Sequence, residues 1–186
     1  MARKKEYLED EVIEKAMNLF WRYGYENTSM QMLEKEMGIN KFSIYSSFGS
    51  KHGVFLESIK AYKSKVNAIF EKFNTASNGV EDIKQFFYDS VDIGKEGMLK
   101  GCLITNTYYE FSEREDALIN EQMILFMDTL KTTFIEKLKM DVTKDDATIL
   151  KEANFLVLAK HGLAAATRVN SEQEIKDYIE MTFKNI

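Results

Sequence analysis

Two short segments with the periodicity of helices lie on either side of Gly38, near the start of the chain. In the first segment, Met30, Leu33 and Met37 recur at steps of three and four, which places them on one face of a helix. Glycine permits a tight turn that a residue with a Cβ would resist, and Asn40 is suited to cap a helix that follows. This pattern predicts two short helices joined by a sharp turn.

The composition favours helices throughout the chain. The 186 residues include no proline and nine glycines, and 45% of them are hydrophobic. No segment shows the sustained alternation of a strand, so we expect an all-α protein. No apolar run approaches the ~18 residues of a membrane span, and the start lacks the apolar core of a signal peptide. With one cysteine, these features predict a cytoplasmic protein without an internal disulfide.

Helical periodicity and capping residues divide the chain into about nine helices. Thr28 with Gln31 and Ser171 with Glu174 form capping-box patterns, and Ser50 is a further candidate cap. We expect helices near 7–23, 28–37, 40–48, 50–75, 80–93, 99–111, 114–139, 145–168 and 171–185. The predicted domains are an N-terminal three-helix domain, residues 1–52, and a C-terminal helical domain, residues 53–186.

The formal net charge of −5 argues against a strongly basic nucleic-acid-binding protein, because binding to phosphates requires cations. The charge is unevenly distributed, however. Residues 1–51 contain eight Lys/Arg and eight Asp/Glu, so the remainder of the chain accounts for the whole excess of acid. A small basic face on an acidic body is compatible with this distribution.

Two helices joined in this way suit DNA reading, since the second helix of a helix-turn-helix fits the major groove. Lysine donates to guanine, serine to several bases, and an aromatic ring contacts a thymine methyl group. The candidate DNA-binding residues are Thr28, Ser29, Lys41, Phe42, Ser43, Tyr45, Ser46, Ser47, Lys51, Arg3 and Lys4. Alternatives stay open: Thr28 and Ser50 are also expected as simple caps, and an αα-hairpin is also a packing motif.

Residues 12–55 resemble the N-terminal domain of the TetR family of transcriptional regulators. The matching positions are Ala16, Leu19, Phe20, Gly24, Tyr25, Thr28, Ser29, Gly38, Ile39, Ile44, Tyr45, Phe48, Ser50 and Lys51. The resemblance implies a homodimer of two-domain helical subunits that represses transcription from palindromic operators and is released by a small ligand. Phe42, Gly49, Glu34 and Met37 depart from the common residues, and Phe42 makes the base preference unpredictable.

The segment Gly101-Cys102-Leu103 resembles a segment found in a subset of these regulators, and aromatic and methionine residues surround it. If they converge, they line an apolar ligand pocket; the alternative is that they form ordinary core. The candidate ligand-binding residues are Tyr62, Phe87, Met98, Cys102, Tyr109, Met123 and Phe126. Cys102 is either a buried apolar residue or a sensor of electrophiles or oxidants whose thiolate Lys100 stabilises.

Small residues around Gly162 allow close helix approach and, with apolar positions on the last helix, predict a four-helix dimer interface. The candidate interface residues are Phe155, Gly162, Ala166, Ile175 and Ile179. His52 and His161 are too few and too far apart in sequence for a metal site, and we expect no cofactor.

A ligand-responsive DNA-binding regulator, most simply a repressor, is therefore the leading interpretation of the sequence. The alternative is a small-molecule-binding or adaptor protein without sequence-specific DNA binding, which the neutral charge of the first 51 residues favours. An enzyme is least expected, because no nucleophile–base pair, carboxylate dyad, phosphate loop or metal spacing stands out. The partners expected are double-stranded operator DNA, a small-molecule effector and a second copy of the chain.

Overall fold

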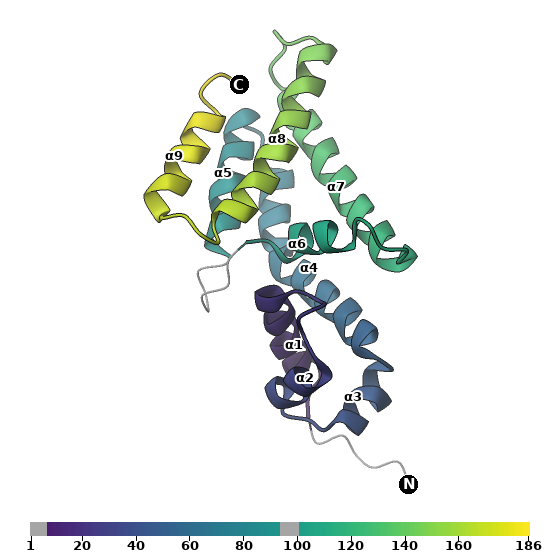
Figure 1. Ribbon diagram of the computed structural model, residues 1–186. Helices are drawn as coiled ribbons and strands as arrows, with labels where there is room; N and C mark the ends of the chain where they lie inside the picture. The colour runs from purple at the N-terminus through teal and green to yellow at the C-terminus, as the bar shows by residue number, and fades with distance from the viewer. Residues whose placement is uncertain (1–6, 94–100) are drawn as a thin grey trace. The chain divides into compact units, whose positions relative to one another are not determined.

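The computed structural model describes residues 7–93 and 101–186, and all regular structure within them is helical (Figure 1). The all-α prediction is confirmed. The helices are α1 (Glu9–Tyr23), α2 (Met30–Met37), α3 (Lys41–Phe48), α4 (Lys51–Thr75), α5 (Val80–Asp92), α6 (Leu103–Phe111), α7 (Ala117–Leu138), α8 (Asp146–Ala166) and α9 (Glu172–Thr182). Within the described residues, no helix combines the length and apolarity needed to cross a membrane.

The chain forms two compact units, Met1–Lys65 and Val66–Ile186. The long helix α4 runs from the first unit into the second, so no loop separates them. The boundary between the two compact units therefore falls inside α4. The sequence instead predicts a domain boundary at residue 52, at the end of the helix-turn-helix segment. The functional division at residue 52 stays a prediction.

Aromatic side chains form much of the core of the N-terminal unit. Phe20 is fully buried on α1, and its ring centroid lies 4.8 Å from that of Phe55 on α4. One residue further along α1, Trp21 packs edge-on against Tyr62 at 4.9 Å. Leu33 of α2 and Ile44 of α3 complete this core, and neither is exposed to solvent. Each of α1, α2 and α3 therefore contributes a buried apolar side chain, which fixes the orientation of that helix in the unit.

Polar caps define the ends of the short helices. Asn40 Oδ1 accepts a hydrogen bond from the Ser43 amide at 2.8 Å, as predicted, and Gly38 adopts the left-handed conformation with φ 71°. The predicted cap of α2 was wrong by one residue. Ser29, not Thr28, accepts the Met32 amide at 3.2 Å, because the Thr28 hydroxyl turns inward.

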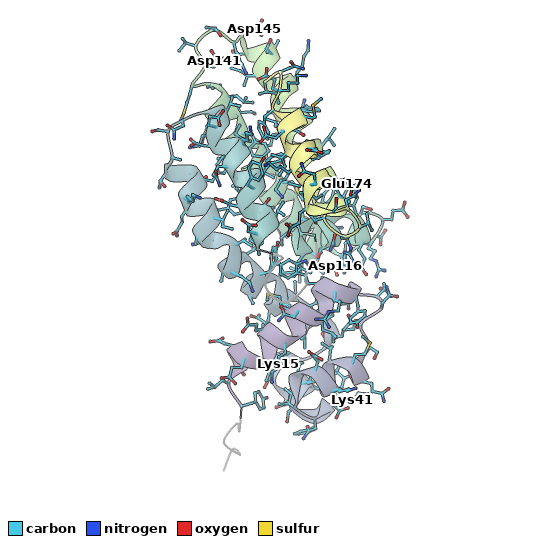
Figure 2. All side chains as sticks on the ribbon, turned by 90° about the vertical axis from the view of Figure 1, so that its left-hand side faces the viewer. Lys15, Lys41, Asp116, Asp141, Asp145 and Glu174 are labelled. Carbon is cyan, nitrogen blue, oxygen red and sulfur yellow. The ribbon has the colours of Figure 1, made fainter. Side chains whose placement is uncertain are left out.

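The C-terminal unit packs α5, α7, α8 and α9 around one apolar core, and α6 packs on α7. Phe87, Phe134, Leu156 and Ile179 are each fully buried at its centre. Polar side chains cap three of its helices. Asp116 and Asp145 cap α7 and α8 (Figure 2), and Ser171 with Glu174 forms the predicted capping box at α9.

A buried ion pair also lies in the C-terminal unit. Lys137 Nζ on α7 lies 3.2 Å from Asp82 Oδ2 on α5, and both side chains are at most 6% exposed. Lys137 also donates to the Ala76 carbonyl oxygen, and Asp82 accepts the Asn78 amide at 2.8 Å. The pair thereby ties α7 to the loop that precedes α5.

Candidate nucleic-acid interface

One face of α3 presents side chains to solvent while the opposite face is buried. Phe42 is 81% exposed and Tyr45 44% exposed, and Lys41 and Ser46 lie on the same exposed side. Ile44 points inward and is fully buried. We call Lys41, Phe42, Tyr45 and Ser46 the α3 face. The Phe42 ring is therefore available to a binding partner.

The first turn of α3 is held from two sides. Glu34 on α2 accepts a hydrogen bond from the Lys41 backbone amide at 2.9 Å, and Asn40 takes the Ser43 amide. The Lys41 ammonium lies 5.9 Å from the Tyr45 ring centroid, within the range of a cation–π interaction. Figure 2 shows Lys41 at the surface of the N-terminal unit. Because the Lys41 and Ser43 amides are occupied, only the Phe42 amide of the first turn and the side chains of the α3 face are available to a partner.

Replacing Glu34 with alanine is expected to lower the stability of the N-terminal unit by about 1 kcal/mol, because the Lys41 amide loses the carboxylate that accepts its hydrogen bond. Glu36→Ala is the matched control, since Glu36 is exposed on the same helix. Trp21, the single tryptophan, reports unfolding of this unit in urea by its fluorescence. Equal losses in the two variants would show that the Glu34 hydrogen bond contributes nothing.

Two of the predicted DNA-binding side chains have structural roles. Thr28 is fully buried, and its hydroxyl donates to the Gly24 carbonyl oxygen at 2.6 Å, so this side chain is not available to a phosphate. Ser47 is half-buried, and its hydroxyl lies 2.8 Å from that of Tyr7, which joins α3 to the start of the described chain. Ser29 is exposed at the α2 amino end, while Ser43 is half-buried.

Lys51 begins α4 beside the aromatic core. Its ammonium lies 4.3 Å from the centroid of the Tyr25 ring, which stacks on Phe20 and tilts against Phe55. This chain of rings positions the cation. Arg3 and Lys4, the other predicted cations, lie outside the described residues.

The predicted ligand-binding residues belong to both units of the chain. Tyr62 belongs to the N-terminal core, and Phe87 and Met123 are buried in the C-terminal unit with at most 1% exposure. Phe126 packs edge-on against Phe70 at 5.3 Å. Met98 lies outside the described residues.

Tyr109 and Cys102 lie at the surface of α6. Tyr109 is 56% exposed, and its hydroxyl lies 3.0 Å from His161 Nδ1 on α8. The other nitrogen of His161 lies 3.2 Å from Met127 Sδ, and burial together with the neighbouring Lys160 charge lowers the pKa of the histidine. Cys102 is half-buried at the amino end of α6. Lys100, its expected cationic neighbour, lies outside the described residues.

Four of the five predicted dimer residues pack within the protomer. Ile175 and Ile179 are buried in the C-terminal core, and a Cβ on Gly162 would lie 2.8 Å from the Tyr178 hydroxyl of α9. Ala166 is half-buried against the same core. Only Phe155, 49% exposed, leaves a large apolar side chain for a partner. Leu150 and Leu158 extend its exposed face along α8, with exposures of 47% and 66%.

Several residues that support the α3 face were not predictable from the sequence. In the sequence Glu34 is only a departure from a common alanine, and no pattern marks Tyr7 or the ring contact between Tyr25 and Lys51. The seven-residue separation of Glu34 and Lys41 is not a helix period, so only the turn at Gly38 brings them together. An acidic residue shortly before a glycine turn is the one signal available in the sequence.

Several regulators are similar to this chain in sequence. The uncharacterised HTH-type transcriptional regulator YezE of Bacillus subtilis (strain 168) is 33% identical over 112 residues, which are 59% of this chain and 58% of that protein. This chain thus spans less than two thirds of YezE. IcaR of Staphylococcus aureus (strain Newman), the HTH-type negative transcriptional regulator of the biofilm operon icaADBC, is 28% identical over 142 residues, 75% of each chain.

Solved structures share the fold over nearly the whole chain. A cysteine mutant of the TetR family regulator CifR, complexed with 26-bp double-strand operator DNA, has a TM-score of 0.85 at 19% identity and covers 99% of each chain. A TetR transcriptional regulator from Legionella pneumophila has a TM-score of 0.80 at 18% identity, covering 99% of this chain and 98% of that one. At these identities the similarity establishes the fold.

The glycine turn between α2 and α3, with the exposed α3 face, defines this chain as a helix-turn-helix protein. The family model described as bacterial regulatory proteins, tetR family, matches residues 12–58, which include the whole motif. Residues 12–58 are thus similar in sequence to the DNA-binding domain of tetR family regulators, and the whole chain shares the fold of solved TetR family structures.

Proposed function

We propose that this protein is a transcriptional repressor that binds a palindromic operator as a homodimer and is released by a small-molecule inducer. The observation that carries the proposal is the α3 face: exposed Phe42, Lys41 and Tyr45 on a helix whose amino end is fixed by caps from α2 and the turn. The negative regulator IcaR and the operator-bound CifR support repression and DNA binding by analogy.

The side chains of the α3 face match the groove chemistry of DNA. The Lys41 ammonium donates to the O6 and N7 acceptors of guanine, and the Phe42 ring contacts a thymine methyl group. Tyr45 and Ser46 donate to backbone oxygens, which fix register without reading sequence. Lys51 adds a cation next to the α4 amino end, where the helix dipole favours a phosphate. Specificity therefore rests on Lys41 and Phe42.

Dimerisation supplies the second reading helix. Two such helices engage successive major grooves when they lie about 34–36 Å apart. We place the dimer interface on the exposed face of α8 formed by Leu150, Phe155 and Leu158, because these apolar side chains are 47–66% exposed in the protomer. Gly162, Ile175 and Ile179 support this face from within the protomer.

A small effector bound in the C-terminal unit would favour a conformation whose reading helices no longer match the groove spacing, which is a population shift. Cys102, Tyr109 and Phe126 remain the proposed effector contacts, whereas Met123 and Phe87 are buried in the C-terminal unit. No catalytic role is proposed. The proposed site of action is the cytoplasm, where the operator DNA lies.

Selection of bound sequences from random DNA tests the proposal most directly. A repressor of this kind enriches a palindrome, and the separation of its half-sites gives the spacing of the two reading helices. An adaptor protein without sequence-specific DNA binding, which the zero net charge of residues 1–51 favours, enriches no sequence. Recovery of random sequences at a salt concentration near 0.15 M would overturn the DNA-reading proposal.

Lys41→Ala and Lys51→Ala are expected to act differently on DNA. Lys41→Ala lowers affinity for the operator more than for random DNA, because a base contact is lost. Lys51→Ala weakens both similarly and lowers the salt-dependence slope by about one. Fluorescence anisotropy titrations at several salt concentrations measure both quantities. Equal losses on operator and random DNA in both variants contradict the assigned roles.

A further inference from the structure

The amino end of α6 packs against α8 within the C-terminal unit. The Gly101 amide donates to Thr167 Oγ1 at 3.1 Å, and a Cβ on Gly101 would lie 3.0 Å from the Ala164 carbonyl oxygen. Cys102, the capping position, makes no side-chain hydrogen bond to the first turn of α6, and that turn carries no acidic residue. The positive end of the α6 dipole therefore faces α8 without an anionic side chain of its own.

Lys160 on α8 is a buried cation beside this helix end. It lies one turn before Ala164 on the same side of α8, and it is 8% exposed. Its ammonium lies 5.8 Å from the centroid of the Phe86 ring. Burial lowers the pKa of Lys160, and the charge interaction with Cys102 opposes this shift. Among the described residues, no carboxylate and no hydrogen-bond acceptor pairs with the ammonium.

Lys137, the other buried lysine of this unit, shows which partners a buried ammonium requires. Lys137 is 3% exposed, and its ammonium is satisfied by the Asp82 carboxylate and the Ala76 carbonyl oxygen. A buried ammonium without such partners is strongly destabilising, because its lost hydration is not replaced. Within residues 7–93 and 101–186, the Lys160 ammonium has the Phe86 ring beside it and no anionic partner. An anion from outside the chain would supply the missing partner.

We propose that Lys160 and the amino end of α6 bind the carboxylate of a small organic molecule. This inference rests on the proposed function, since that molecule would be the effector. The carboxylate pairs with the Lys160 ammonium and accepts hydrogen bonds from the first amides of α6. Phe86 and Leu103, at most 4% exposed, provide apolar surface for the body of the molecule. The ligand class is therefore an apolar carboxylic acid.

Thermal unfolding of the full chain with matched acid and amide probes tests the site. Acetate, hexanoate and benzoate are each compared with acetamide, hexanamide and benzamide at constant ionic strength. We expect hexanoate or benzoate to raise Tm by about 3 °C or more near saturation, and the amides to leave it unchanged. Lys160→Met should abolish the shift, whereas Lys151→Met, an exposed lysine on the same helix, should retain it.

The unliganded Lys160→Met variant gives a second readout. Because it removes an unpaired buried charge and keeps the side-chain volume, its Tm should equal or exceed that of the wild type. Equal shifts with acids and amides, no shift with any acid, or a shift retained in Lys160→Met would each overturn the site. None of these measurements includes DNA, so failure here leaves the operator selection untouched. Failure of that selection likewise leaves the carboxylate response intact.

Discussion

Replacing Lys137 with methionine is expected to lower the free energy of unfolding by about 3–5 kcal/mol. The substitution keeps the length of the side chain but leaves the Asp82 carboxylate, 6% exposed, without its counterion. The Ala76 carbonyl oxygen loses its donor as well. Urea unfolding followed by far-UV circular dichroism, which is dominated by helices, measures the loss.

The exposed ion pair between Lys60 and Glu57 is the matched control. Its nitrogen and oxygen lie 2.6 Å apart, but the side chains are 61% and 44% exposed. Lys60→Met is expected to change stability by less than about 1 kcal/mol, because solvent already screens the pair. Asp82→Asn combined with Lys137→Met should recover part of the loss, since no unpaired charge remains and the asparagine still accepts the Asn78 amide. If the double variant is less stable than Lys137→Met, the loss does not come from an unpaired carboxylate.

Lys137 also marks the limit of prediction from the sequence. A lysine on a long helix is expected at the surface, and nothing local indicates otherwise. Its burial is possible only because Asp82, 55 residues earlier in the chain, arrives at the same place. The burial of Lys160, Ile175 and Ile179 likewise could not be predicted locally, because the helices that surround them are far apart in the sequence. Which residues of α8 and α9 are buried depends on which side of each helix packs against α5 and α7.

The N-terminal motif was predictable because its signals are local. The glycine turn, the Asn40 cap and the apolar spacing of Leu33 and Met37 each act within a few residues, and the structure confirms all three. The wrong prediction of Thr28 as the cap also concerns interactions within a few residues. Thr28 and Ser29 both suit a cap, and only the inward carbonyl of Gly24 decides which hydroxyl is free to serve α2.

The positions of the exposed side chains on the α3 face were predictable, but the contacts that hold α3 in place were not. Helical periodicity alone separates the exposed Phe42 from the buried Ile44. The hydrogen bond from Lys41 to Glu34 spans the turn and depends on its three-dimensional path. No comparable local pattern exists for an effector site, because its residues come from several helices. That is why the predicted ligand-binding residues are scattered over both units.

Two phenylalanines in the N-terminal unit are expected to separate folding from DNA reading. Phe20→Ala should lower the stability of this unit by about 3–5 kcal/mol, because a fully buried ring leaves a cavity against Phe55 and Tyr25. Since Tyr25 supports the Lys51 ammonium, DNA affinity should fall on every sequence. Phe42→Ala removes the same atoms from an 81% exposed position, so stability should change by less than about 0.5 kcal/mol.

For Phe42→Ala the expected change is in sequence preference. Loss of a contact with a thymine methyl group should cost about 1–3 kcal/mol on the preferred operator and little on random DNA. Urea titration of Trp21 fluorescence measures stability, and repeated selection from random DNA measures preference. An unchanged consensus with Phe42→Ala would remove this residue from base reading, and a stability loss as large as that of Phe20→Ala would place its ring in the core. The pair thus tests directly whether the α3 face is built for recognition, since the same chemical deletion is made on both sides of one small domain.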